Sequence, residues 1–195
     1  ERPAITQAFF DFLKTTANGA EALYILGDLF EAWLGDDDDT PVFLEAIAHI
    51  KAYADQGHRV YFMHGNRDFL IGEQFAKMAN VTLLNDPTVI EYHQQQYLLM
   101  HGDSLCTLDD EYMQFRAMVR NPEWQHTILS KSLEERREYA RAVRAQSRSM
   151  TSLKAEDILD VTPNEVVKAM RAHKVQHFIH GHTHRPAVHE LTVDQ

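Results

Sequence analysis

The chain has 195 residues, 44% of them hydrophobic and 25% charged, which is the usual balance of one soluble globular domain with a real core. The net charge of -10 argues against broad nucleic-acid binding, and we expect neither a bilayer-spanning segment nor a signal peptide. The single cysteine, Cys106, excludes an internal disulfide and fits a reducing compartment.

The first eighty residues alternate predicted helices with short buried strands. Pro3 and apolar residues at helical spacing predict a helix to about Ala17. The elements expected next are a strand over 22–26, a helix over 40–55, a strand over 59–63 and a short helix over 72–79. The run from Asp36 to Asp39 is interpreted as a solvated acidic turn.

The pattern changes after residue 80. Three strand-like runs separated by polar turns are followed by charged helical segments that break near Asn121-Pro122. In chain order we expect strands over 81–84, 88–92 and 96–100, helices over 109–148 and 162–173, a strand over 175–179 and, more loosely, a strand over 187–193. We interpret the chain as one domain over 1–195 with a helical insertion over 109–154.

Four of the apolar strands end in a glycine flanked by short polar residues. They run into Gly-Asp at 27–28, His-Gly-Asn at 64–66, His-Gly-Asp at 101–103 and His-Gly-His at 180–182. In α/β sheets, ligands bind beyond the carboxyl ends of the strands. We therefore expect these residues to converge on one site.

The residue types at these strand ends suit a metal centre. A carboxylate at Asp28, an amide oxygen at Asn66 and imidazoles at 101, 182 and 184 form a mixed oxygen and nitrogen set that favours Mn²⁺, Fe²⁺ or Zn²⁺ over Ca²⁺. Two such cations roughly 3.5–4 Å apart would promote in-line attack on a phosphoryl group. Arg67 could hold a phosphate oxygen through its planar guanidinium.

Each residue also has a simpler interpretation. Asp28 could be a helix cap, Asn66 a turn residue, His101 a hydrogen-bonded core histidine, and the histidines at 180–184 a surface loop. If the segment after Ile179 is extended, His182 and His184 point to the same side. His180 and His64, which precede their glycines, are interpreted as supporting residues.

These motifs resemble the calcineurin-like metallophosphoesterase superfamily. Its pattern runs Asp-x-His, Gly-Asp, Gly-Asn-His-Asp/Glu, a histidine, then Gly-His-x-His, and all but the first match in order here. The fold implied is an α/β sandwich of mixed β-sheets flanked by helices, with a helical cap. Arg67 stands where most members have histidine. Gly-Asn-Arg-Asp, with Leu-Gly-Asp-Leu-Phe at 26–30 and His-Gly-Asp-Ser-Leu-Cys at 101–106, is similar to the pyrophosphatase branch that acts in lipid A biosynthesis.

The resemblance implies a role for each matching residue. Two Mn²⁺ ions are implied, with Asp28 bridging both, His184 on the first, and Asn66, His101 and His182 on the second. His182 and Arg67 would also stabilise charge on the phosphoryl group. The substrate contacts implied are Asn66, Arg67, Asp109, Ser147, Thr151, Lys154 and His182, with Thr151 replacing the asparagine of the family.

The resemblance also implies a substrate and a location. The expected reaction cleaves the pyrophosphate of a UDP-linked diacylated glucosamine at the cytoplasmic side of the inner membrane, where the protein is peripheral. No obligate protein partner is expected. Because the chain lacks Asp-x-His and the last strands of the family, we expect a weak first metal site and little activity if the molecule begins at Glu1.

The helical insertion carries a basic face. Arg137, Arg141, Arg144 and Arg148 follow one another at helical spacing, so they could meet anionic lipid headgroups. The alternative is a solvated helix whose arginines pair with Glu134, Glu135 and Glu138. Two other functions stay open: a different dinuclear-metal phosphodiesterase or nucleotide pyrophosphatase, and a scaffold of the same fold that has lost its metals.

Overall fold

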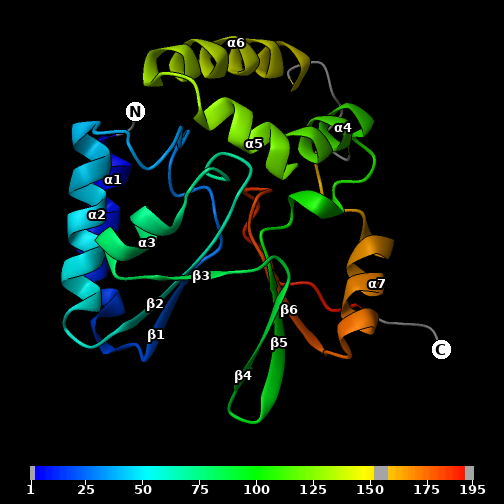
Figure 1. Cartoon of the computed structure of the whole chain (residues 1–195). Coiled ribbons are helices and arrows are strands. Elements are labelled where there is room, and N and C mark those ends of the chain that lie inside the picture. The colour runs from blue at the N-terminus through cyan, green and yellow to red at the C-terminus, as the bar shows by residue number, and fades with distance from the viewer. Residues whose placement is uncertain (1–2, 152–157, 192–195) are drawn as a thin grey trace.

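The computed structural model describes residues 3–151 and 158–191, with side chains described outside 146–151. Two three-stranded sheets lie at its centre (Figure 1). The first is parallel in the order β1 (Ala22–Ile25), β2 (Arg59–Met63), β3 (Thr82–Leu84). The second has the order β4 (Thr88–Tyr92), β5 (Gln95–Met100), β6 (His177–His180), with β4 and β5 antiparallel and β5 and β6 parallel. The predicted α/β fold with mixed sheets is confirmed.

Helices cover both sheets and supply two apolar cores. The helices beside the first sheet are α1 (Pro3–Lys14), α2 (Pro41–Ala54) and α3 (Glu73–Ala79), with the 3-10 turn η1 (Thr16–Gly19) after α1. Ile50, Phe62 and Phe75 are completely buried in the core that they share. The smaller core joins Leu98 of β5 to Val166 of α7 (Pro163–His173). Each such buried side chain contributes about 1.5–3 kcal/mol.

The predicted insertion is helical and lies over the ends of the strands (Figure 1). After the short turn η2 (Asp103–Leu105) it consists of α4 (Asp110–Val119), α5 (Pro122–Leu129) and α6 (Leu133–Thr151). Ile128 of α5 is buried in the larger core, and Trp124 packs against Phe69 and Tyr139. The cap is therefore fastened to the domain by apolar contacts. No helix in the described ranges has the length and apolarity to cross a membrane.

The predicted boundaries agree with the observed ones within a few residues, apart from the end of the chain. The last strand begins at His177 rather than Val175, because Val175 closes the turn after α7 by bonding to the carbonyl of Met170. Residues 187–191 form no strand, and Val188 is almost fully exposed. The rest of that predicted strand lies outside the described residues.

The interpretation of residues 36–39 as a solvated turn is wrong for two of the four. The Asp36 carboxylate accepts hydrogen bonds from the indole of Trp33 and from the backbone of Gly72 and Phe75. Asp38 is only 4% exposed and accepts from Thr40. These carboxylates join the segment to α3 and to the start of α2, which local composition does not reveal.

The basic face predicted for α6 is largely occupied by contacts within the protein. Arg137 binds Asp38 at 3.0 Å, and Arg144 binds Glu31 at 2.6 Å. Arg141 pairs with Glu134 at 2.9 Å, as the solvated-helix alternative proposed. The side chain of Arg148 is outside the described set. Two of the three described arginines therefore hold the cap against the domain rather than facing solvent alone.

Among the cap residues whose side chains are described, Arg136 is the most buried cation, with 3% of its surface exposed. It donates to the carbonyl of Leu34 and forms a fork with the Asp37 carboxylate, lowering the pKa of that carboxyl. Gly35 makes room for it, since a Cβ there would lie 2.2 Å from the guanidinium.

We expect Arg136→Gln to lower the free energy of unfolding by about 1.5–3 kcal/mol, because hydrogen bonds of a buried charge are lost. Arg141→Gln, on the same helix but in an exposed pair, should change it by less than about 1 kcal/mol. Urea denaturation of both variants makes the comparison. Equal losses would contradict an anchoring role for Arg136.

Candidate metal centre

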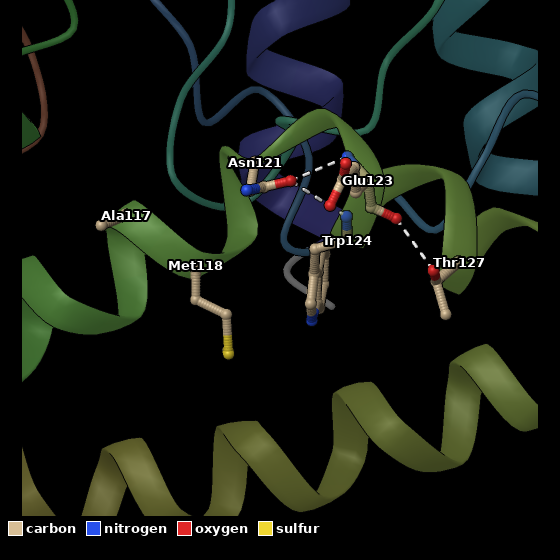
Figure 2. Close-up of a pocket in the computed structure, with 6 residues that line it drawn as sticks. All are labelled: Ala117, Met118, Asn121, Glu123, Trp124 and Thr127. Atoms are coloured by element: carbon tan, nitrogen blue, oxygen red, sulfur yellow. Dashed lines mark hydrogen bonds between the residues drawn. The ribbon is translucent and has the colours of Figure 1, made fainter.

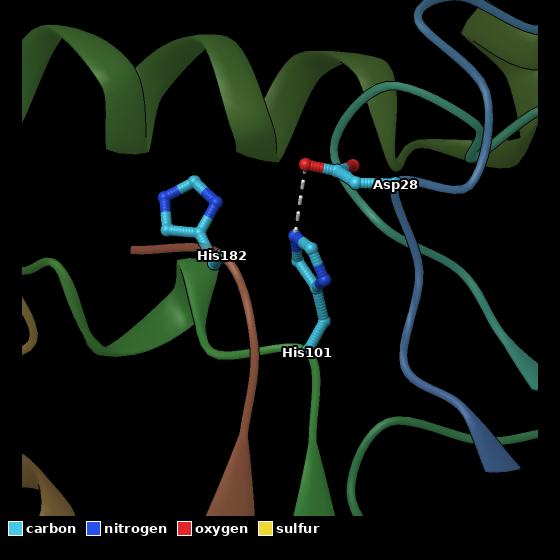
Figure 3. Close-up of side chains that lie close together, drawn as sticks. All are labelled: Asp28, His101 and His182. Atoms are coloured by element: carbon cyan, nitrogen blue, oxygen red, sulfur yellow. Dashed lines mark ion pairs between the residues drawn. The ribbon is translucent and has the colours of Figure 1, made fainter. Parts of the chain in front are cut away.

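The polar ends of four strands meet at one place, as the sequence predicts. Asp28 follows β1, Asn66 follows β2, His101 follows β5 and His182 follows β6. Figure 3 shows three of these side chains pointing toward one another below the cap. One ligand atom from each of Asp28, His101 and His182 lies within 4.8 Å of those from the other two.

Two glycines allow the first two loops to approach each other. Gly27 has φ +83°, and a Cβ there would lie 2.4 Å from the Cα of Gly65. A Cβ on Gly65 would lie 2.2 Å from the Asp28 carboxylate. A side chain at Gly27 would therefore push against the loop at Gly65 and against His101, and one at Gly65 would displace Asp28.

Asn66 belongs to the same cluster. Its amide oxygen is 3.1 Å from Nε2 of His101 and 2.9 Å from Nδ1 of His182. The Asp28 carboxylate is 3.8 Å from Nε2 of His101. Four residues from four strand ends thus surround one point.

The orientation of the His101 ring is fixed by a hydrogen bond on the side away from the cluster. Its Nδ1 lies 2.7 Å from the carbonyl of Leu26, which can only accept, so Nδ1 carries the proton. The lone pair of Nε2 is thereby turned toward Asn66 and Asp28, and the Asn66 backbone amide donates to it at 3.3 Å. A carbonyl behind a histidine is the usual support for a metal ligand. His101 is completely buried, so the alternative of a core histidine also fits its surroundings.

The donor set fits a divalent cation. The Asp28 carboxylate, the Asn66 amide oxygen and Nε2 of His101 are acceptors that face one another, and such groups repel unless positive charge lies among them. Burial, followed by the neighbouring imidazole of His101, lowers the pKa of His182 to about 4. Its imidazole is therefore neutral at pH 7, the form that binds metals.

His184 lies beside this cluster rather than in it. Its side chain is exposed, although it is near enough to lower the pKa of His182. The expectation of an extended segment is wrong, because φ is +67° at His182 and +55° at His184. The alternation that would place both on one side does not apply, and His184 as a ligand of a first metal stays a prediction.

Arg67 adjoins the cluster beside Asp28. Its backbone amide donates to the Asp28 carboxylate at 2.9 Å, and its guanidinium lies 3.6 Å from the other oxygen. The same guanidinium pairs with Glu31 at 3.0 Å. An arginine with about a third of its side chain exposed is therefore held beside the candidate metal ligands.

The other predicted substrate contacts are only partly described. Asp109 is 7% exposed and caps α4 by accepting from the backbone of Tyr112. Ser147 and Thr151 lie on α6 with side chains outside the described set, and Lys154 lies outside the described residues. The supporting roles predicted for His64 and His180 fit contacts with the carbonyls of Ile71 and Gly181.

Sequence reasoning missed two buried acids beside the site. Asp68 is fully buried and accepts from the backbone amides of Gly65, Leu29 and Phe30. Burial, followed by the charge of Asp28, raises its pKa to about 6. Asp68 therefore connects the loop after β2 to the loop after β1 by hydrogen bonds. The sequence feature that could have revealed Asp68 is its position as the last residue of Gly-Asn-Arg-Asp, two residues after Asn66.

The second missed acid is Asp103. It is also fully buried, and it accepts from Tyr112 at 2.7 Å and Arg116 at 2.9 Å. Burial alone raises the pKa of Asp103, but Arg116 and the Tyr112 hydroxyl together lower it by more. Cys106 is buried with its pKa raised to about 12, chiefly by burial, so it is a poor nucleophile.

A carboxylate, an amide and two imidazoles at strand ends, with an arginine beside them, define a metal-dependent phosphoesterase type of site. The family model for calcineurin-like phosphoesterases matches residues 3–186. The chain therefore belongs to the calcineurin-like phosphoesterase family, and the resemblance seen in its motifs is confirmed.

The similar curated proteins are more specific. The chain is 53% identical to the UDP-2,3-diacylglucosamine hydrolase of Chromohalobacter salexigens, over 99% of this chain and 78% of that protein. It is 55% identical to the protein of that name from Marinobacter nauticus, over 97% and 78%. The Pseudomonas aeruginosa protein, of the same name, is 53% identical over 100% and 81%.

Proposed function

We propose that this protein hydrolyses the pyrophosphate bond of UDP-2,3-diacylglucosamine to UMP and 2,3-diacylglucosamine 1-phosphate, a step of lipid A biosynthesis. The observation that carries the proposal is the convergence of Asp28, Asn66, His101 and His182 beside Arg67. The names of the similar proteins supply the substrate.

The proposed cofactor is a pair of Mn²⁺ ions. Asp28 would bridge them, His184 would serve the first, and Asn66, His101 and His182 would serve the second. Such a pair supplies an activated water and neutralises charge on the attacked phosphoryl group. The support from this chain is that its acceptors face one another and that His182 is neutral.

Arg67 is proposed to hold the phosphoryl group. Its guanidinium now pairs with Glu31, whose side chain is 54% exposed. Exposed pairs contribute little, so an arriving phosphate can replace the Glu31 carboxylate. A planar fork suits two phosphate oxygens and leaves the amide contact of Arg67 with Asp28 in place.

The remaining substrate contacts are proposed at Asp109, Ser147, Thr151 and Lys154. Asp109 caps α4, and Ser147 and Thr151 belong to α6, so these contacts would come from the cap. A cap that contacts the sugar or its acyl chains would orient the pyrophosphate beneath it. Thr151 can donate or accept a hydrogen bond, as the family asparagine does.

We propose that the protein works at the cytoplasmic face of the inner membrane. The acyl chains of the proposed substrate would hold that substrate in a bilayer. A groove of about 320 Å³ runs along α4 and α5 and contains Met118 and Trp124 (Figure 2). Met118, Leu129 and Tyr139 are exposed on the cap. These apolar surfaces, rather than the paired arginines of α6, are the proposed contact with lipid.

Vesicle binding checks this contact. Because Arg137 and Arg144 are already paired, we expect co-sedimentation with phospholipid vesicles to persist when salt is raised from 0.05 to about 0.5 M, conditions that screen exposed charges. The double change Met118→Ser with Leu129→Ser should reduce it. Binding lost in salt and unaffected by those changes would favour electrostatic attachment instead.

The reaction is tested by turnover of the lipid substrate and of an aryl phosphodiester, each with Mn²⁺ and after chelation. We expect metal-dependent release of UMP from the lipid substrate and little cleavage of the aryl ester. Turnover of the aryl ester alone would indicate the rival phosphodiesterase. No metal-dependent turnover of either would indicate the scaffold.

A further inference from the structure

The first helix of the cap presents one polar face to the strand ends. Tyr112, Arg116 and Arg120 are spaced by four residues, so they lie on one side of α4 and its last turn. All three approach Asp103, which is fully buried two residues after His101: the Tyr112 hydroxyl at 2.7 Å, Arg116 at 2.9 Å and Arg120 at 3.8 Å.

Arg120 extends past Asp103 to the loop that carries Asn66. Its guanidinium donates to the carbonyl of Gly65 at 3.0 Å and to that of His64 at 3.4 Å. The guanidinium also lies 5.7 Å from the ring centre of Phe69, which follows in the same loop. After Met63 the loop pairs with no strand in the described ranges. Its backbone amides donate to Asp28, Asp68 and His101, while Arg120 holds two of its carbonyls.

The place of Asn66 depends on these two carbonyls. Its amide oxygen lies between His101 and His182, and the peptide planes of His64 and Gly65 immediately precede it. Both bonds come from one nitrogen of the guanidinium, Nη2, and a donor that holds the two carbonyls limits rotation of those planes.

We propose that Arg120 is a positioning residue of the metal centre: buried Asp103 holds its guanidinium against the carbonyls of His64 and Gly65, and docking of α4 thereby sets the position of Asn66. This inference rests on the proposed function in assuming that Asn66 binds metal. It adds a link from the cap to a ligand of the site.

The test compares Arg120→Gln and Arg120→Lys with Arg59→Gln, an exposed arginine at the start of β2. Equilibrium dialysis of the full chain measures Mn²⁺ binding. We expect the Kd of Arg120→Gln to rise roughly ten- to a hundredfold, as for other residues that support metal ligands. Arg120→Lys should lie between, and Arg59→Gln should match the parent.

Amide hydrogen exchange of the metal-free protein separates positioning from general stability. In both Arg120 variants, exchange should quicken in residues 64–68 and stay unchanged in α2 and β2. Unchanged exchange in that loop, or quicker exchange throughout the protein, would overturn the proposal. If exchange in residues 64–68 quickens in the Arg120 variants but the parent binds no Mn²⁺, the proposed function is contradicted, while the role of Arg120 in fixing the loop is supported.

Discussion

Asp28→Asn is expected to reduce kcat/KM roughly a thousandfold, the effect of losing several kcal/mol of metal-assisted stabilisation. Asp28 supplies the carboxylate of the described cluster, 3.8 Å from His101. An amide keeps the shape and can still accept from the backbone of Arg67, but it carries no charge for two cations to share. Turnover and Mn²⁺ content of the purified variant measure the loss.

The choice of asparagine follows from the backbone. Asp28 has φ +56°, a region that asparagine tolerates and alanine enters at about 1–2 kcal/mol. Asp28→Ala would therefore mix strain with the loss of the ligand. Asp39→Asn, at an exposed position of the same connection between β1 and α2, is the matched control. If Asp28→Asn kept near-normal turnover and metal content, the bridging assignment would be wrong.

The sequence predicted the site because its signal is local. Each strand end carries a glycine and a polar residue, and the parallel strands of an α/β sheet bring such ends together. Residues 60–63 form a continuous apolar run that is largely buried, and the predicted limits of that strand, 59–63, match β2.

Other features could not be predicted, because they depend on contacts between residues that are far apart in the sequence. Asp38 is buried because Arg137, ninety-nine residues later, reaches it. The arginines of α6 have helical spacing whether they face lipid or carboxylates, so spacing could not tell the two apart. His182 and His184 adopt positive φ after β6. Such a conformation is usually predicted from a glycine or an asparagine, and neither residue type stands at these two positions.

Asp68→Ala is expected to lower the free energy of unfolding by about 3–5 kcal/mol. The carboxylate is fully buried, and its removal leaves the amides of Gly65, Leu29 and Phe30 without their acceptor. Each buried donor left unpaired costs about 1–3 kcal/mol, and the weakest of the three bonds, at 3.5 Å, adds little. Urea denaturation of the metal-free protein gives the value.

Asp68→Asn separates the charge of this side chain from its shape. Its amide oxygen can replace only one carboxylate oxygen, and its NH₂ group then faces backbone donors, so we expect a loss only slightly smaller than for alanine. Asp55→Asn, an exposed carboxylate that also accepts two side-chain hydrogen bonds, is the control and should change stability far less. Asp68 lies between the loops that carry Asp28 and Asn66, so a folded Asp68 variant should also bind Mn²⁺ more weakly. If either Asp68 variant were as stable as the parent, Asp68 would not be what holds the two loops together, and their approach would rest on Gly27, Gly65 and the bond from the Arg67 amide to Asp28.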